Sequence, residues 1–254
     1  MSSRTWVRAL LFLLLLCFGF GLLSVVLQDR SDPSPGNPSA TTPAGPPAST
    51  STPSAASTAI LILGVDNLDQ ESPRLLATWV AAHDPEQDQL LLYGIPTSAS
   101  APTGDGRPLA SLFTWSRTAG VGDDFMQALS ALVPLTYQAT VVMDEAAFAA
   151  AVDALGGADL GGTHLQGAQL LAFLRLLQTK PEALLAAQAE VLLALRPGLQ
   201  DLGAAPDISD LEALHPDHVH LTLEPQQLAA LVAPMLPFEA ASIRVGTLLD
   251  QPEF

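Results

Sequence analysis

The residues best placed to do chemistry lie in one short acidic loop that follows an apolar segment. This loop, residues 66–74, contains three acids, Asp66, Asp69 and Glu71, and ends at Arg74. Carboxylate oxygens gathered in one loop are suitable ligands for a hard cation, although these three lack the regular spacing of a calcium-binding loop. Because binding and catalytic residues are commonly carried by loops, the sequence predicts that any ionisable site lies here.

A second group of candidate residues consists of three histidines in the last quarter of the chain, His215, His218 and His220. The last two lie on one face of an expected strand, and three imidazoles can hold zinc. The alternative is that these histidines form the polar edge of a loop and a strand. Both interpretations stay open at this point.

The charge of the chain excludes some functions. The formal net charge is −16, and from residue 59 onward seven Lys and Arg stand against twenty-four Asp and Glu. A field of this sign repels polyanions, and no basic patch is present, so nucleic acid is not an expected partner. The sequence also lacks a Gly-x-Ser-x-Gly element and a glycine-rich phosphate loop. The one cysteine, Cys17, leaves no internal disulfide.

Three apolar runs, residues 59–63, 75–82 and 89–95, must position the acidic loop. Each run is short and is bounded by Gly, Pro or Asp, which is typical of a buried strand. Three such runs in succession indicate the centre of a sheet that is covered on both faces. The acidic loop then connects the first two strands.

Helices and strands are expected to alternate along the rest of the chain. Asp144 is expected to cap a helix at its amino end, and Gly156 and Gly157 to end that helix. The predicted fold class is therefore α/β, a single domain whose mixed central sheet is flanked by helices on both sides. The two expected helices at residues 164–178 and 181–195 are apolar almost all round, which predicts deep burial. The expected helices are residues 108–118, 123–133, 145–155, 164–178, 181–195 and 225–236, and the later strands are residues 137–143, 218–223 and 241–248.

The N-terminal segment, residues 9–27, contains no charge and follows Arg4 and Arg8. Its length crosses most of a hydrocarbon core about 30 Å thick, so we expect a transmembrane anchor, with a cleaved signal peptide as the alternative. The arginines before the span predict that residues 1–8 are cytoplasmic. We therefore expect a single-pass protein of the cell membrane with an extracytoplasmic C-terminal domain.

A linker is expected between the anchor and the folded domain. Residues 28–58 are rich in Pro, Ser, Thr, Ala and Gly. Such a segment buries too little apolar surface to offset the entropy lost on ordering, so we expect it to be disordered. It would hold the domain, residues 59–254, at a distance from the membrane.

Several motifs resemble the LytR-CpsA-Psr (LCP) family. The first strand leads into a Gly-x-Asp sequence ending at Asp66, and the third leads into an Ile-Pro pair ending at Pro96. Residues 148–160, FAAAVDALGGADL, closely match the family's helix–turn–strand, and residues 164–178 resemble its next helix. The resemblance, which covers residues 59–195, implies the same α/β fold. It also implies a membrane-anchored enzyme that moves glycopolymers from a polyprenyl-pyrophosphate carrier onto the bacterial cell wall.

The resemblance also carries a set of site residues onto this chain. In the family, several arginines hold a pyrophosphate, and aspartates bind a divalent metal. By this resemblance Asp66, Arg74 and Arg175 are the candidate catalytic residues, and Arg74, Arg175 and Gln188 are the candidate ligand-binding residues. Asp66 would be the metal ligand and Mg²⁺ the cofactor. Several arginines are needed because bidentate guanidinium groups match the oxygens of a pyrophosphate.

Most of the other charges that the family uses are missing. Four arginines are replaced, and at about 1.5–3 kcal/mol for each hydrogen bond to a charged group their loss costs pyrophosphate binding on the order of 6–12 kcal/mol. We therefore expect a degenerate site with an apolar wall. The replaced positions, including two that carry acids in the family, are Leu76, Thr97, Ser98, Leu177, Leu184 and Ala187.

The leading prediction is an LCP-like cell-envelope protein that binds a polyprenyl lipid or assists active LCP relatives. One alternative is an active phosphotransferase with a site rebuilt around Asp66, Arg74 and Arg175. Another alternative is an extracytoplasmic binding or scaffolding domain unrelated to the family's activity. A further interpretation of Arg74 and Arg175 is that both are simply paired with buried acids. The expected partners are the membrane, a polyprenyl lipid and active relatives.

A reporter fused after Phe254 tests the predicted topology. If residues 9–27 are an uncleaved anchor, the reporter is active only outside the cytoplasm, and the full-length mass is recovered from membranes. Recovery of a soluble form that begins near Ser31 would instead identify the segment as a signal peptide.

Overall fold

The computed structural model describes residues 58–84, 89–100, 106–201, 214, 217–232 and 243–247. The expected anchor, residues 9–27, and the linker up to residue 57 lie outside these ranges. Within them, no helix has the length and apolar character that a membrane span requires. The anchor and the topology therefore stay predictions.

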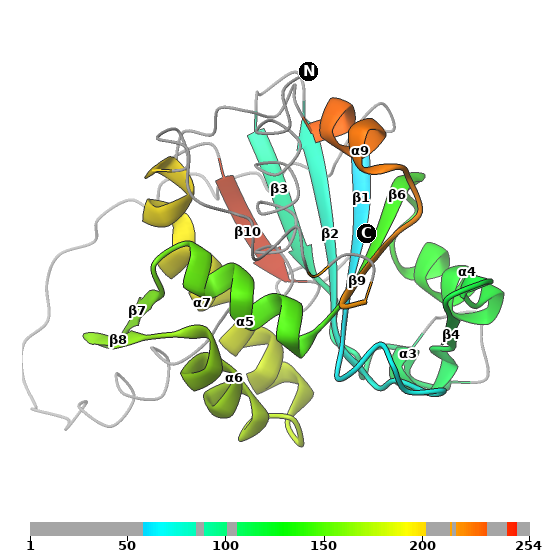
Figure 1. Cartoon of the computed structure of the whole chain (residues 1–254). Helices are drawn as coiled ribbons and strands as arrows, with labels where there is room; N and C mark the ends of the chain where they lie inside the picture. The colour runs from blue at the N-terminus through cyan, green and yellow to red at the C-terminus, as the bar shows by residue number, and fades with distance from the viewer. Residues whose placement is uncertain are drawn as a thin grey trace, which may run out of the picture.

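One mixed sheet forms the centre of the molecule. In the described residues its six strands are β1 (Thr58–Val65), β2 (Leu75–Asp84), β3 (Gln89–Gly94), β6 (Tyr137–Asp144), β9 (Val219–Leu221) and β10 (Ile243–Thr247). They lie in the order β10-β3-β2-β1-β6-β9 (Figure 1). β1 is parallel to β6 and β3 is parallel to β10, while the other neighbours are antiparallel. The three apolar runs thus form three adjacent strands, as predicted.

The side chains of β1 show why both faces of the sheet are covered. Ile60 and Ile62 belong to one buried cluster, whereas Leu61 and Leu63 belong to another. All four are fully buried. Successive side chains of a strand point to opposite faces, so a continuous apolar run requires a core on each side. At about 1.5–3 kcal/mol for each buried aliphatic side chain, this strand stabilises both cores.

Helices lie on both faces of the sheet (Figure 1). The main helices of the described residues are α3 (Leu109–Leu112), α4 (Asp123–Leu132), α5 (Glu145–Ala154), α6 (Gly167–Arg175), α7 (Pro181–Asp201) and α9 (Pro225–Val232). Residues of α5, α6, α7 and α9 join the cluster that contains Ile60, and residues of α3 and α4 join the cluster that contains Leu61. The predicted α/β architecture is confirmed.

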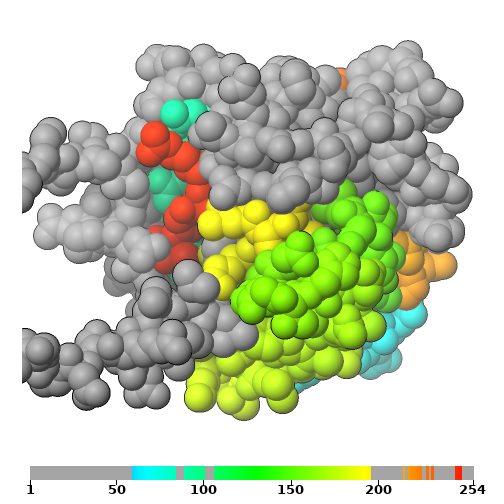
Figure 2. Space-filling model, turned by 90° about the vertical axis from the view of Figure 1, so that its left-hand side faces the viewer, coloured from blue at the N-terminus to red at the C-terminus, as the bar shows by residue number. Residues whose placement is uncertain are grey.

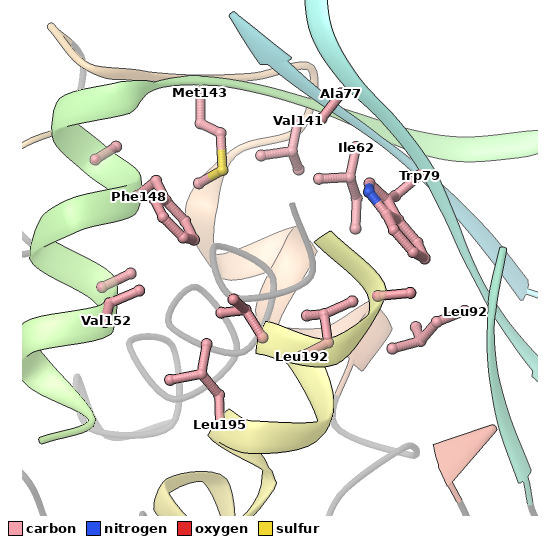
Figure 3. Close-up of a cluster of buried hydrophobic side chains, with 14 of the residues drawn as sticks. Ile62, Ala77, Trp79, Leu92, Val141, Met143, Phe148, Val152, Leu192 and Leu195 are labelled. Atoms are coloured by element: carbon pink, nitrogen blue, oxygen red, sulfur yellow. The ribbon is translucent and has the colours of Figure 1, made fainter. Parts of the chain in front are cut away.

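The larger core lies between the sheet and the helices α5 and α7. Figure 3 shows side chains from these elements pointing into one shared cluster, among them Trp79, Phe148 and Leu192. On one side of the molecule α7 lies between β10 and the α5–α6 pair (Figure 2). α7 approaches β3 closely because Gly94 has no side chain: a Cβ there would lie 2.6 Å from Leu185 Cδ1.

The predicted helix at residues 108–118 is wrong beyond α3. The chain instead forms a hairpin of β4 (Trp115–Ser116) and β5 (Gly120–Val121). Gly120 has a φ of +74°, a conformation that glycine adopts readily and that suits the hairpin turn. Phe113 and Trp115 are both buried in the core of α3 and α4. Burial of these aromatic side chains therefore outweighs the local preference for a helix.

The predicted helix at residues 164–178 begins later and is less buried than expected. A two-stranded ribbon of β7 (Ala158–Leu160) and β8 (Thr163–Leu165) precedes it, and α6 begins at Gly167. Leu170 and Leu174 are buried on one face of α6, but Arg175 is exposed. In contrast, α7 is buried over most of its first four turns, as predicted, and it continues beyond residue 195 to Asp201.

The turn between α5 and β7 has the predicted helix–turn–strand form. Gly156 and Gly157 have φ values of +86° and +91°. A Cβ on Gly157 would lie 2.8 Å from both His164 Nε2 and the Leu165 carbonyl oxygen. Nearby, the Asp153 carboxylate accepts a hydrogen bond of 2.7 Å from the backbone N–H of Gly167, which attaches α6 to α5. The form of this turn therefore serves the packing of α5 against the β7–β8 ribbon and α6.

Replacement of Gly157 by valine is expected to destabilise the domain strongly, because the positive φ and the close contacts both resist a β-branched side chain. Gly156→Val is the matched control, since Gly156 also has a positive φ but a Cβ there meets no atom within 4 Å. Gly157→Val should lose at least about 1 kcal/mol more free energy of unfolding than this control. The measurement is urea and thermal unfolding of the full-length chain. A melting temperature within about 2 °C of the parent's would contradict this account of the turn.

Candidate functional site

The ion pairs of Arg74 with Asp66 and of Arg175 with Glu145 lie at one edge of the central sheet, where β1 and β6 end and β2 begins. Figure 1 shows the strands that form this edge. Val65, the last residue of β1, pairs with Leu75 at the start of β2 and with Asp144 at the end of β6. β9 begins at the same edge, where Val219 pairs with Met143. Crevices at the carboxyl ends of strands are the usual ligand sites of α/β sheets. We call this region, formed by residues 66–74, 117, 144–145, 175 and 217–218, the carboxyl edge.

Asp66 and Arg74 close the loop between β1 and β2. The Asp66 Oδ1 atom accepts hydrogen bonds from the backbone N–H groups of Asn67 at 2.9 Å and of Arg74 at 2.8 Å. Its Oδ2 atom accepts one from Arg74 Nε at 2.8 Å. The Asp66 side chain is 12% exposed and the Arg74 side chain 68%. Asp66 is therefore a fixed part of the loop, and Arg74 reaches from it into solvent.

Arg175 forms a two-pronged ion pair with Glu145. Arg175, in the last turn of α6, donates from Nε to Glu145 Oε1 at 3.2 Å and from Nη2 to Oε2. Glu145, the first residue of α5, is 11% exposed, while Arg175 is 56% exposed. The hydrogen bond to Glu145, and then the attraction of its charge, raise the pKa of Arg175 above its ordinary value. The interpretation that both arginines pair with buried acids is thus confirmed.

Gln188 lies beneath the carboxyl edge, inside the core. Its side chain is almost completely buried in α7. Its Oε1 atom accepts a hydrogen bond of 3.2 Å from Trp79 Nε1, and its Nε2 atom donates to the Leu76 carbonyl oxygen at 3.1 Å. Buried polar groups need such partners. The amide thus attaches α7 to β2 through both of its polar atoms.

Four of the six positions that differ from the family pattern belong to the core. Leu184 and Ala187 of α7 are buried, and Leu76 and Leu177 pack against the same cluster. Their side chains contribute to the core that contains Trp79 rather than to a charged surface. These positions are apolar, and an apolar wall that faces a ligand stays a prediction.

The residues described do not fit the implied Mg²⁺ site. Both carboxylate oxygens of Asp66 already accept hydrogen bonds. Oδ1 accepts two from the backbone N–H groups that close the loop, and Oδ2 accepts one from Arg74 Nε. Among the described residues, no three His, Cys, Asp or Glu side chains gather as a metal site would require. Asp69, the second acid of the loop, bonds Arg117 instead.

The histidine group does not appear as a zinc site in the described residues. His215 lies outside them, and His218 and His220 have other neighbours. His218 Nδ1 lies 2.8 Å from Asp144 Oδ2, and the ring of His220 meets the ring of Trp115 edge to face at 5.8 Å between centroids. The alternative prediction, a polar edge of a loop and a strand, describes this geometry.

Sequence reasoning missed two parts of the carboxyl edge. Asp144 was predicted as a helix cap, and it accepts hydrogen bonds from the backbone N–H groups at the start of α5. Its role as the partner of His218 depends on β9 and has no signal in the local sequence. Arg117 of the β4–β5 hairpin was also missed, and it bonds Asp69 Oδ1 at 2.8 Å and the Asp217 carbonyl oxygen at 3.1 Å.

These contacts define what the carboxyl edge can do. Arg74, Arg117 and Arg175 are each engaged by a carboxylate. A guanidinium that already binds a carboxylate has fewer donors and less unbalanced charge to offer a phosphate. The described geometry is therefore that of an edge whose arginines are each paired with an acid of the same chain, while their side chains stay partly open to solvent.

Asp144 offers a direct test of how the edge is held together. Asp144→Ala removes the acceptor that caps α5 and the partner of His218, whereas Asp144→Asn keeps an oxygen for the cap. We expect the alanine variant to lose about 1–2 kcal/mol more free energy of unfolding than the asparagine variant, as helix caps typically contribute. Urea denaturation of the full-length chain measures this difference, and equal stabilities would show that the cap contributes nothing.

No family model and no curated protein matches the sequence, but solved structures match its fold. TagV from B. subtilis matches with a TM-score of 0.57 and 17% identity, over 76% of this chain and 85% of that one. A LytR-Csp2A-Psr enzyme from Actinomyces oris matches with a TM-score of 0.57 and 18% identity, over 77% and 83%. TagT bound to LIIa-WTA matches with a TM-score of 0.55 and 15% identity, over 75% and 78%.

These likenesses agree with the motifs found in the sequence. They extend over about three quarters of the chain. Identities this low carry the fold rather than the site residues. The chain therefore has the fold of the LytR-CpsA-Psr proteins.

Proposed function

We propose that this chain is an LCP-like cell-envelope protein that has lost the pyrophosphate-binding site of a transferase and acts as a lipid-binding or accessory protein. The neighbours of the same fold include TagT bound to LIIa-WTA and TagT bound to LI-WTA, which supports a role near cell-wall assembly. The proposal also includes the predicted anchor and an extracytoplasmic location for the domain. Active relatives of the same fold are the proposed protein partners.

The observation that carries the proposal is the state of the two retained arginines. Arg74 and Arg175 both bind carboxylates of this chain, Asp66 and Glu145. A pyrophosphate carries several negative charges and is held best by several free guanidinium groups. Two engaged arginines are a poor substitute for such a cluster.

The replaced positions support the same conclusion. Leu184 and Ala187 are buried core residues, and Leu177 is partly buried against the same cluster. An arginine at any of these positions would need a partner, because an unpaired buried charge is costly. The region beside the edge thus has no unpaired cation for a headgroup at these positions, so we propose that a polyprenyl lipid is held chiefly by its apolar chain.

The overall charge of the chain adds to this argument. Its formal net charge is −16, which repels a polyanionic headgroup as it approaches. This repulsion is screened beyond about 8–10 Å at physiological salt, so it modulates binding and does not decide it alone. The contacts at Arg74 and Arg175 carry more weight.

An active phosphotransferase is the second candidate, and one observation favours it. The side chains of Arg74 and Arg175 are 68% and 56% exposed, so a ligand can reach them. Of the three nitrogen atoms in the Arg74 side chain, only Nε has a hydrogen-bond partner among the described residues. A rebuilt site would have to act through these two groups.

Binding of three lipids distinguishes the candidates. The full-length chain in detergent is titrated with a polyprenyl alcohol, its monophosphate and its pyrophosphate, and the dissociation constants are compared. We expect the three constants to agree within about fivefold, since no free arginine cluster is present to discriminate between the headgroups. TagT, which binds LIIa-WTA in its crystal structure, is the positive control for a protein of this fold.

A transfer assay on the same preparation tests the alternative that the chain is an active phosphotransferase. Metal-dependent turnover of a polyprenyl-pyrophosphate substrate that vanishes in Asp66→Ala and Arg175→Ala would identify the chain as an enzyme. Failure of all three lipids to bind would instead favour a binding or scaffolding domain unrelated to lipid.

A further inference from the structure

Glu145 occupies the position at which an anionic ligand would meet Arg175. The guanidinium of Arg175 presents Nε and Nη2 to the two oxygens of this carboxylate. The same pair of donors is the one that grips two oxygens of a phosphate. An anion and Glu145 therefore compete for one side of one guanidinium.

Glu145 is held more firmly than Arg175. Its side chain is 11% exposed, and it is the first residue of α5, behind the capping residue Asp144. A negative side chain is favoured at the amino end of a helix by the helix dipole. A ligand that displaced Glu145 would leave this carboxylate buried without its partner, which is strongly unfavourable. The Glu145 carboxylate is thus a fixed part of the protein that competes with any anionic ligand, while the Arg175 side chain faces solvent.

Asp66 has the same relation to Arg74. The carboxylate is fixed by two backbone N–H groups, and the arginine is the exposed member of the pair. Val65 pairs with both Leu75 and Asp144, so the two ion pairs begin on strands two spacings apart, about 10 Å. Arg74 directly precedes β2 and Glu145 directly follows β6, so the two ion pairs lie at the same end of the sheet.

We propose that Glu145 is a specificity-determining residue that excludes anionic headgroups by occupying Arg175, so that this edge accepts the uncharged part of a lipid. The inference rests on the proposed function and names the residue that sets its headgroup preference. Removal of the Glu145 charge should release Arg175 and create a binding site for a small polyanion such as inorganic pyrophosphate.

The test titrates inorganic pyrophosphate, without metal, into the full-length chain in detergent and measures the dissociation constant calorimetrically. Glu145→Gln should bind at least about tenfold more tightly than the parent, since a hydrogen bond to a charged group contributes a factor of this size. The double variant Glu145→Gln with Arg175→Ala should lose the gain. Glu182→Gln is the matched control, because Glu182 is an exposed acid at the start of α7 and the change in charge is the same.

Two further measurements guard against misfolding of the glutamine variant. Glu145→Ala places a strong helix former at the first position of α5 and should show the same gain. In the parent, the NMR resonance of Arg175 Nε should not shift with up to millimolar pyrophosphate. A saturating shift in the parent would overturn the proposal, and so would folded Glu145→Gln and Glu145→Ala variants that bind no better than the parent.

The outcome is independent of the lipid titration. If none of the polyprenyl lipids binds but Glu145→Gln gains pyrophosphate binding, the proposed function fails and the role of Glu145 stands. If the lipids bind without headgroup preference but the Glu145 variants gain nothing, the proposed function stands and this inference fails.

Discussion

The parallel pairing of β1 with β6 is the constraint on which the rest of the described structure depends. Parallel neighbours need a long crossover, which here contains β2, β3, α3, the β4–β5 hairpin and α4. With neighbours on both sides and an apolar face on each, β1 can be stable only if helices cover both faces. The same register sets Val65 beside Asp144, so the loop after β1 and the start of α5 meet at one edge.

The arginines of that edge are paired with carboxylates of the same chain. Three arginines from distant segments, Arg74, Arg117 and Arg175, each contact a carboxylate. Two of these carboxylates, those of Asp66 and Glu145, are nearly buried, and a buried acid without a partner would destabilise the fold. The arginines thus stabilise the domain by satisfying its acids. That role competes directly with binding a phosphate, since one guanidinium cannot serve both fully.

The apolar residues beside the edge complete the same pattern. Leu184 and Ala187 join the core between the sheet and α7, which Gln188 crosses with a pair of hydrogen bonds to β2. The Leu76 carbonyl oxygen is one of its partners, so the backbone at the start of β2 is held from within the core. A region with this packing is organised by buried area and a few satisfied polar groups. It is an apolar core next to ion pairs formed within the chain.

The sequence by itself determined the elements whose signals are local. Continuous apolar runs predicted β1, β2 and β3, and Asp144 and Gly157 predicted a cap and a turn because their preferences act within a few residues. The acidic loop with Asp66 and Arg74 was also found this way. Only the tertiary structure decided that Arg175 binds Glu145, 30 residues away, and that Gln188 binds Trp79, 109 residues away. Such partners depend on strand order and helix placement, which no short-range pattern of residues encodes.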